Sequence, residues 1–342
     1  LTDAAIRSAD YVFLSAMSVQ SASAEEVIRR CKKLGTAVVA GGPHFTSSPE
    51  QYPEVDHLVL DEAENTLPRF CRDVESGHPQ HLYRAEDWAD IATTPVPQWD
   101  LISHKHYSSM NIQYSRGCPF DCDFCDITVL YGRKPRTKTR TQVLAELDAL
   151  SATGWKGPLF FVDDNFIGNK AKLKRDILPA IADWMQDHRH PFYLNTEASI
   201  NLADDLELMR LMGQAGFEAV FIGIETPHEA SLASCGKTVN GGRDLIASVR
   251  QIQRAGIEVQ GGFIVGFDED PPSIFARLTE FIQESGIVTA MVGLLNAPKG
   301  TRLYNRLHAE GRLLNEFNGN NTDFATNFVP RMDEASLLSG YR

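Results

Sequence analysis

Short apolar runs alternate with amphipathic segments along the first part of the chain. The runs at 10–15, 37–40 and 58–60 are separated by stretches whose apolar positions have helical spacing. Apolar runs bounded by turn residues predict buried strands, and their alternation with helices predicts parallel βαβ units. We therefore expect a Rossmann-like, doubly wound α/β sheet here, with its first strand and helix missing upstream of residue 1.

A second and longer series of the same kind begins near residue 110. Six candidate strands, each followed by a helical pattern, lie at 110–117, 158–164, 193–199, 219–225, 258–267 and 289–297. Six consecutive strand–helix units predict a parallel, TIM-like (β/α)6 partial barrel. The expected domains are a partial Rossmann-like domain at 1–78, a proline-containing linker at 79–109, the barrel at 110–300 and a C-terminal extension at 301–342.

Polar pairs predict where several helices begin. In a capping box, a hydroxyl and a carboxylate or amide three residues later satisfy exposed N–H groups of the first turn. Pairs with this spacing are Ser23 with Glu26, Thr139 with Gln142, and Asp204 with Glu207. We expect a helix to start at each of them.

The charge of the chain argues against nucleic-acid binding. A formal net charge of −12 over 342 residues produces a field that repels phosphate backbones. No apolar run reaches the roughly 18 residues that a membrane span requires, and no signal-peptide pattern is visible. We expect a cytoplasmic protein that acts on a small molecule, with no nucleic-acid partner and no membrane span.

Three cysteines, Cys118, Cys122 and Cys125, lie within eight residues directly after the first predicted barrel strand. Such a cluster in a long chain predicts metal binding rather than a disulfide framework. Barrel enzymes build their active sites at this end of the strands. Three thiolates can hold three irons of a [4Fe-4S] cluster and leave the fourth iron open. The alternative is a structural zinc site completed by His104 or His106.

The CxxxCxxC motif, with the aromatic Phe124 before its last cysteine, resembles the signature of the radical S-adenosylmethionine (SAM) superfamily. The runs 125–138, 162–165 and 223–226 further resemble cobalamin-binding radical SAM proteins, a group that includes the hopanoid methylases. The resemblance implies that the open iron binds SAM and that an electron from the cluster cleaves SAM to a 5′-deoxyadenosyl radical. It also implies a cytoplasmic electron donor such as flavodoxin or ferredoxin.

Polar and glycine residues at the ends of the later strands are the candidate SAM contacts. Carboxylates at a shared barrel rim can accept hydrogen bonds from ribose hydroxyls or an ammonium group. The resemblance assigns the loop after the second strand to the SAM amino group and Glu225 to the ribose. The predicted SAM-binding residues are Phe124, Asp163, Asp164, Asn165, Glu197, Glu225, Gly261 and Gly266. Ordinary helix caps, solvated acids and a strand bulge are the alternatives.

A basic stretch in this acidic chain follows the cysteines. It consists of Arg133, Lys134, Arg136, Lys138 and Arg140. A solvated charged loop and a contact with an anionic group of SAM or another cofactor both account for this composition.

A glycine pair after the second strand of the first domain predicts close backbone approach to a nucleotide tail. With 60–67, this loop resembles the second half of a corrinoid-binding domain; its candidate cobalamin residues are Gly41, Gly42, Pro43 and His44. The DxHxxG motif, whose histidine ligates cobalt, is not in the chain, and His44 does not replace it. The family often has glycine at the position of Asp61. We expect cobalamin in the intact protein, and binding by this chain alone stays open.

The leading functional hypothesis from this resemblance is methyl transfer from methylcobalamin to an unactivated carbon of a small or lipid-like substrate. A cobalamin-dependent oxidative cyclase or rearrangement enzyme would use the same motifs. A tRNA methylthiotransferase needs three further cysteines upstream, where only Cys31 and Cys71 occur. A non-catalytic zinc-binding module is the remaining alternative. Cys31, Cys71 and Cys235 are predicted to be small core residues.

Overall fold

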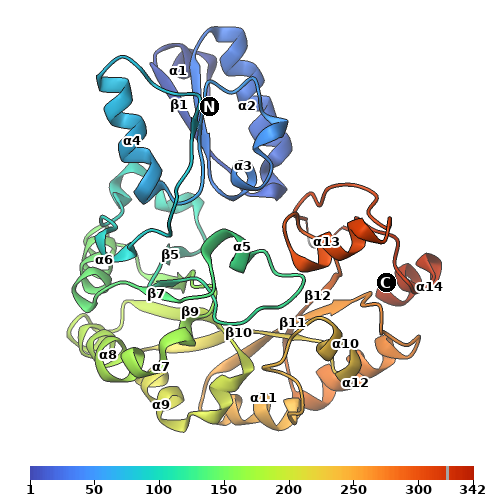
Figure 1. Cartoon of the computed structure of the whole chain (residues 1–342). Helices are drawn as coiled ribbons and strands as arrows, with labels where there is room; N and C mark the ends of the chain where they lie inside the picture. Colours follow the sequence, from blue (N-terminus) through green and yellow to red (C-terminus); the bar gives the residue numbers. More distant parts are fainter. Residues whose placement is uncertain (321–322) are drawn as a thin grey trace. The chain divides into compact units, whose positions relative to one another are not determined.

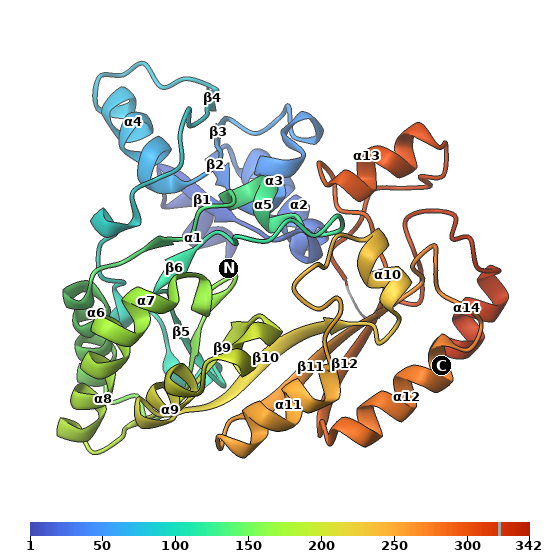
Figure 2. The same cartoon turned by 60° about the horizontal axis from the view of Figure 1, so that its bottom comes forward.

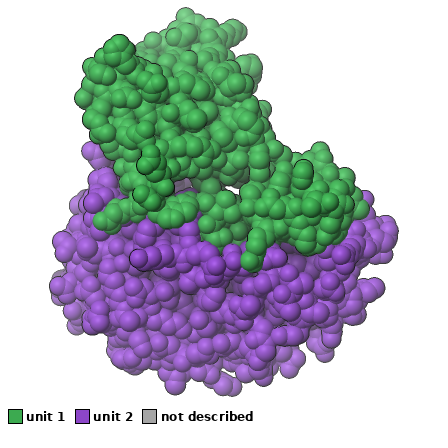
Figure 3. All heavy atoms as spheres, in the orientation of Figure 1, with its two compact units in different colours: residues 1–90, 124–130, 296–329 green, residues 91–123, 131–295, 330–342 purple. Residues whose placement is uncertain are grey.

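The structure is a computed structural model that describes residues 1–320 and 323–342. Two compact units make up the chain (Figure 3). The first consists of Leu1–Asp90, Phe124–Leu130 and Asn296–Val329, and the second of Ile91–Asp123, Tyr131–Leu295 and Pro330–Arg342. The domain boundaries expected at 78, 109 and 300 stay a prediction.

The first unit contains a parallel sheet of four strands in the order β1-β2-β3-β4. The strands are β1 (Tyr11–Ser15), β2 (Ala37–Gly41), β3 (His57–Val59) and β4 (Leu82–Tyr83). The helices of its N-terminal part are α1 (Asp3–Arg7), α2 (Ser21–Leu34), α3 (Pro43–Ser47) and α4 (Ala63–Glu75). Strand β4 falls inside the stretch that the prolines predicted to be linker.

Both faces of this sheet are covered, as expected for a doubly wound fold. Successive side chains of a strand point to opposite faces. Val38 of β2 therefore packs in one core cluster with Ile28 of α2, while Val39 packs in another with Phe70 of α4. Figure 1 shows α2 and α4 on opposite sides of the strands.

The second unit contains six parallel strands in the order β12-β11-β10-β9-β8-β5. They are β5 (Met110–Ile112), β8 (Gly157–Phe161), β9 (Phe192–Ala198), β10 (Phe217–Glu225), β11 (Glu258–Val265) and β12 (Thr289–Leu294). All six predicted strands are present, in sequence order across the sheet. This arrangement confirms the predicted parallel partial barrel, with β5 and β12 at its edges.

Helices follow each other along the outer side of this sheet (Figure 2). They are α6 (Arg140–Ala152), α8 (Leu178–Asp187), α9 (Leu206–Gln214), α11 (Leu245–Arg254) and α12 (Ile274–Ser285). The shorter elements are α5 (Ile127–Tyr131), α7 (Lys170–Lys172), α10 (Glu229–Ser234), α13 (Arg302–Ala309), α14 (Glu334–Tyr341), β6 (Ser115–Arg116) and β7 (Arg136–Thr137). One large apolar cluster fills the space between sheet and helices.

Of the three predicted helix starts, one is confirmed. Thr139 caps α6, and the Thr139 N–H donates to Gln142 Oε1 at 3.0 Å in a complete capping box. The Ser23 prediction is wrong because α2 already begins at Ser21, which places Ser23 inside the first turn.

The third predicted start is wrong by one residue. Helix α9 is capped by Asp205, whose carboxylate accepts the Leu208 N–H at 3.0 Å. The neighbouring Asp204 instead forms an ion pair with Arg243 at 2.7 Å.

The structure also tests the predicted core cysteines. Cys31 and Cys235 are buried, which confirms the prediction for both. Cys71 is exposed, so its prediction is wrong. The buried face of α4 contains Phe70, and the next residue lies about 100° further around the helix. Within the described residues, every helix is too short or too polar to cross a membrane.

Candidate active site at the strand ends of the barrel

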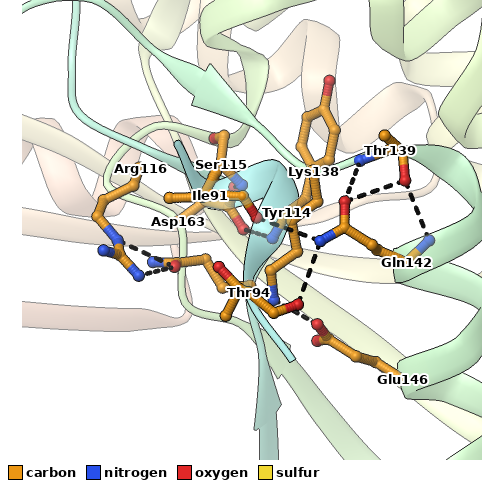
Figure 4. A network of polar contacts seen from close by, with 11 residues as sticks. Ile91, Thr94, Tyr114, Ser115, Arg116, Lys138, Thr139, Gln142, Glu146 and Asp163 are labelled. Atoms are coloured by element: carbon orange, nitrogen blue, oxygen red, sulfur yellow. Dashed lines mark hydrogen bonds and ion pairs between the residues drawn. The ribbon is translucent and has the colours of Figure 1, made fainter. Parts of the chain in front are cut away.

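Two consecutive aspartates that follow β8, Asp163 and Asp164, hold the segment that leads into the cysteine loop. Figure 4 shows Asp163 beside Tyr114 and Ser115. Asp163 is buried, and its carboxylate accepts the backbone N–H of Tyr114 at 3.1 Å and that of Ser115. The carboxylate of Asp164 accepts the N–H of Gly117 at 2.6 Å. Both aspartates therefore contact the backbone immediately before Cys118.

The backbone of the loop itself requires glycine at its start. Gly117 has φ +93°, and a Cβ there would lie 3.0 Å from the carbonyl oxygen of Gly132. The next residue, Cys118, donates its N–H to the same oxygen at 3.3 Å. Further along, the Asp123 N–H donates to the carbonyl of Cys235 at 2.8 Å. Main-chain hydrogen bonds thus hold the loop at Cys118 and at Asp123.

The three cysteines of the motif are half-buried thiols. Burial raises the pKa of Cys118 and raises that of Cys122 to about 11. Iron coordination replaces the thiol proton, so a buried thiol remains competent as a ligand. Cys125 belongs to the segment Phe124–Leu130 of the first unit. The intervening chain limits its Cα to about 11 Å from that of Cys122.

This donor set fits a [4Fe-4S] cluster, because the cubane needs one thiolate for each of three irons. A tetrahedral zinc site needs four ligands that converge on one ion. Among the described residues, no three or more His, Cys, Asp or Glu side chains are arranged to hold a metal ion, and this includes the three cysteines, so the finding does not separate the two kinds of site.

Glu225 ends β10 in an unusual backbone conformation. It has φ +64°, and β10 shifts register against β11 between Gly223 and Glu225. Its carboxylate accepts a hydrogen bond from Lys237 Nζ at 2.6 Å, and both side chains are nearly buried. A Cβ on Gly223 would lie 2.4 Å from Glu225 Oε1, so the ion pair covers this glycine.

Lys237 was not among the predicted site residues. The Lys237–Glu225 pair forms because the loop after α10 returns to the end of β10. No rule of sequence spacing predicts this return. The available sequence clue was a lysine 12 positions after a strand-end glutamate.

Glu197, on β9, is half-buried and experiences several nearby charges. Burial raises its pKa to about 7, the negative charges of Asp164 and Glu225 act in the same direction, and Lys237 acts against them. The acids predicted from three different strand ends therefore interact electrostatically, as expected for a shared barrel rim.

Asn165, also predicted at this rim, joins the ends of β8 and β9. It is buried, its amide Nδ2 donates to Ser199 Oγ at 3.2 Å, and its Oδ1 accepts the Ser199 N–H at 3.3 Å. Asn165 therefore connects the two strand ends, and a contact with SAM would have to use the same amide group.

The two predicted strand glycines occupy different surroundings. A Cβ on Gly261 would lie 2.7 Å from the ring of Phe263, on the face of β11 that packs toward the helices. Gly266 has φ +102° and donates its N–H to the buried Asp270 at 2.9 Å. Glycine is needed at both positions for the protein's own packing, and adenine contact stays a prediction.

The basic stretch after the cysteines is largely paired within the protein. Lys138 is buried and forms an ion pair with Glu146, so the solvated-loop interpretation is wrong for this residue. Arg133 lies 3.5 Å from Asp121, and Arg140 lies 3.7 Å from Asp176.

In the first unit, the predicted cobalamin residues begin with Gly41, the last residue of β2, and continue directly after it. A Cβ on Gly41 would lie 2.3 Å from the carbonyl oxygen of Val59, and one on Gly42, at φ +84°, would lie 2.5 Å from Ser15 Oγ. Pro43 begins α3. These positions lie at the carboxyl ends of parallel strands, where doubly wound sheets bind ligands.

His44, the last of these residues, is buried. Its Nε2 lies 2.5 Å from the hydroxyl of Tyr52, and burial lowers its pKa. The ring is therefore engaged with Tyr52 within its own unit, and its role toward cobalamin stays a prediction.

Asp61 stands where the family often has glycine, and its backbone explains why. Its φ is +62°, a conformation that glycine adopts without cost. Three hydrogen bonds stabilise the aspartate here: its N–H donates to Thr46 Oγ1 at 2.9 Å, and its carboxylate accepts from Ala85 N–H at 3.0 Å and from Arg84 at 3.4 Å. The loop geometry is thus compatible with aspartate.

Comparison with known protein families shows which family the chain belongs to. Residues 112–282 match the radical SAM superfamily, and this range contains the cysteine motif and five of the six barrel strands in whole or in part. The chain belongs to the radical SAM superfamily. Residues 1–70 match the B12 binding domain, and residues 301–342 match a domain of unknown function, DUF4070.

Two relatives of this radical SAM protein extend the comparison. It is 45% identical over 336 residues to an uncharacterized methyltransferase of Synechocystis sp., covering 97% of this chain and 62% of that protein. It is 38% identical over 321 residues to the hopanoid C-2 methylase of Rhodopseudomonas palustris, covering 92% and 61%. The chain thus spans a little over three fifths of the length of these relatives.

A solved structure shares the fold of this radical SAM protein. The radical SAM methyltransferase TsrM from Kitasatospora setae superposes with a TM-score of 0.73 at 14% identity, over 90% of this chain and 67% of that one. These matches confirm the family and the fold class. The radical SAM and B12 binding matches also confirm the predicted cofactors, which are a [4Fe-4S] cluster and SAM, with cobalamin for the intact protein.

Proposed function

We propose that the intact protein is a cobalamin-dependent radical SAM methyltransferase that methylates an unactivated carbon of a small or lipid-like substrate. The observation that carries this proposal is the presence of a B12 binding match at 1–70 and a radical SAM match at 112–282 in one chain. The 38% identity to a hopanoid C-2 methylase supports methyl transfer and a lipid-like substrate.

The cysteine loop would hold the cluster through Cys118, Cys122 and Cys125. When bound, the cluster supplies the electron for reductive cleavage of SAM. The backbone anchors at Gly117 and Asp123 orient the loop so that the thiols are presented from a fixed main chain.

The acidic rim would bind the polar groups of SAM. Carboxylates at Asp164, Glu197 and Glu225 can accept hydrogen bonds from ribose hydroxyls and from the amino group. Lys237 neutralises Glu225 in the protein alone, and its ammonium group is also suited to the SAM carboxylate. The half-buried surroundings strengthen these interactions because they limit competition from water.

The first unit would contribute the corrinoid loop through Gly41, Gly42, Pro43 and His44. The reaction requires a low-potential electron donor, for which flavodoxin or ferredoxin is the expected class. We place the reaction in the cytoplasm, because a reducing compartment preserves both the thiols and the reduced cluster.

An anaerobic assay of the full-length protein with methyl-labelled SAM, cobalamin, a reductant and a lipid extract tests the proposal. We expect label in a lipid product, together with 5′-deoxyadenosine. Formation of 5′-deoxyadenosine without any methylated product would contradict methyl transfer and support the oxidative cyclase or rearrangement alternative.

A further inference from the structure

We infer that Asp163 is a positioning residue for the cluster loop: it holds the backbone of Tyr114 and Ser115, and it does not bind SAM. This inference rests on the proposed function of the cysteine loop as the cluster site. It reassigns a residue that the strand-end pattern placed among the SAM contacts.

The contacts of Asp163 support this role. The residue is 1% exposed, and Figure 4 shows its carboxylate directed at the main chain of the segment before the cysteines. One oxygen, Oδ2, accepts the Tyr114 N–H at 3.1 Å, and Oδ1 accepts the Ser115 N–H. The two carboxylate oxygens thus receive two consecutive backbone donors.

A carboxylate is suited to this task because both of its oxygens are acceptors. An asparagine of the same shape would turn an NH₂ group toward one of the two N–H donors and leave that donor buried without an acceptor. The neighbouring Asp164 accepts the N–H of Gly117. Asp163 therefore holds the backbone of Tyr114 and Ser115, and Asp164 holds that of Gly117, the residue directly before Cys118.

Contacts on the opposite edge hold the same segment. Tyr114 accepts the Lys138 N–H on its carbonyl oxygen at 2.8 Å, and β6 pairs antiparallel with β7. The Lys138 ammonium group is buried against Glu146 of α6, which fixes Lys138 in turn. The path into the first cysteine is therefore set from both edges.

Asp163→Asn in the full-length protein tests the inference, with Met212→Ala as the matched control. Met212 is fully buried in α9, so its truncation destabilises the same unit without touching the loop. Amide hydrogen exchange of the metal-free protein reports the positioning directly, and iron content after anaerobic reconstitution reports its consequence.

We expect Asp163→Asn to increase the exchange rate of the Tyr114 and Ser115 amides at least tenfold. We also expect the iron content of the reconstituted variant to fall below half of the parent value. Met212→Ala should retain parent iron despite its lower thermal midpoint. Asp163→Glu, which keeps both acceptor oxygens, should hold more iron than Asp163→Asn.

Parent-like exchange of these amides in Asp163→Asn would overturn the inference, as would equal iron loss in Met212→Ala. If the variants fail to fold, amide exchange of the parent protein tests the inference. The Tyr114 and Ser115 amides must then exchange at least a hundredfold more slowly than in an unstructured peptide. Exchange at the rate of an unstructured peptide would contradict the positioning role of Asp163. Failure of the parent to take up iron would instead contradict the proposed function, while amide exchange still decides the role of Asp163.

Discussion

At the residue scale, the rim of the barrel concentrates features that cost stability. Glu225 has a left-handed backbone at φ +64°, a conformation that costs roughly 1–2 kcal/mol for a residue with a side chain. Its carboxylate is also nearly buried and depends on Lys237 for charge compensation. Strain and buried charge of this kind gather at functional sites.

Removal of the lysine should therefore be costly. Lys237→Met leaves the Glu225 carboxylate buried without its cation, and we expect the free energy of unfolding of the metal-free protein to fall by about 3–5 kcal/mol. Urea unfolding measures this change. Arg306→Ala, which breaks the exposed pair with Glu310, is the control and should cost no more than about 1 kcal/mol. Equal losses in the two variants would show that the Lys237–Glu225 pair is not effectively buried.

Glu197 predicts a pH dependence of stability. Its pKa is about 7 in the folded protein and 4.5 without perturbation, so the folded state binds more protons between these values. The free energy of unfolding therefore falls as the pH rises through this window, because the charged form is penalised on folding.

Glu197→Gln should remove its own part of that slope. We expect the loss of stability between pH 5 and pH 7 to become smaller by about 2 kcal/mol. Urea unfolding of the metal-free parent and variant at the two pH values provides the comparison. An unchanged slope would mean that Glu197 titrates near its ordinary value.

At the element scale, the apolar runs predicted the barrel strands well, because a buried parallel strand is a short, nearly continuous apolar segment. Helix starts were less predictable. Thr139 and Gln142 form a capping box, whereas Ser23 and Glu26 have the same spacing inside α2. The spacing alone cannot distinguish a cap from a first-turn serine, since the decision depends on how the preceding chain packs.

The confirmed box gives a direct prediction for α6. Thr139→Ala removes the acceptor of the Gln142 N–H and should lower the free energy of unfolding by about 1 kcal/mol. Ser273 precedes α12 without a side-chain cap, so Ser273→Ala is the control and should stay within about 0.5 kcal/mol of the parent. A loss in Ser273→Ala as large as that in Thr139→Ala would contradict the assigned cap.

At the scale of the whole molecule, the order of elements along the chain does not reveal which segments pack together. Residues 296–329 belong to the first unit, where Lys299 pairs with Glu50 and lies 3.4 Å from Glu316. No periodicity in the sequence links a position near 300 to one near 50. The same reason hid Lys237 from the predicted site, while the cysteine motif, which is local in sequence, was recognised.

The central claim is that Cys118, Cys122 and Cys125 hold a [4Fe-4S] cluster that cleaves SAM. Anaerobic reconstitution with iron and sulfide, followed by addition of dithionite and SAM, is its most direct measurement. We predict about four irons per chain, visible absorption and 5′-deoxyadenosine formation, all lost when the three cysteines are changed to alanine. A colourless parent protein that leaves SAM intact under strong reductant would contradict the claim.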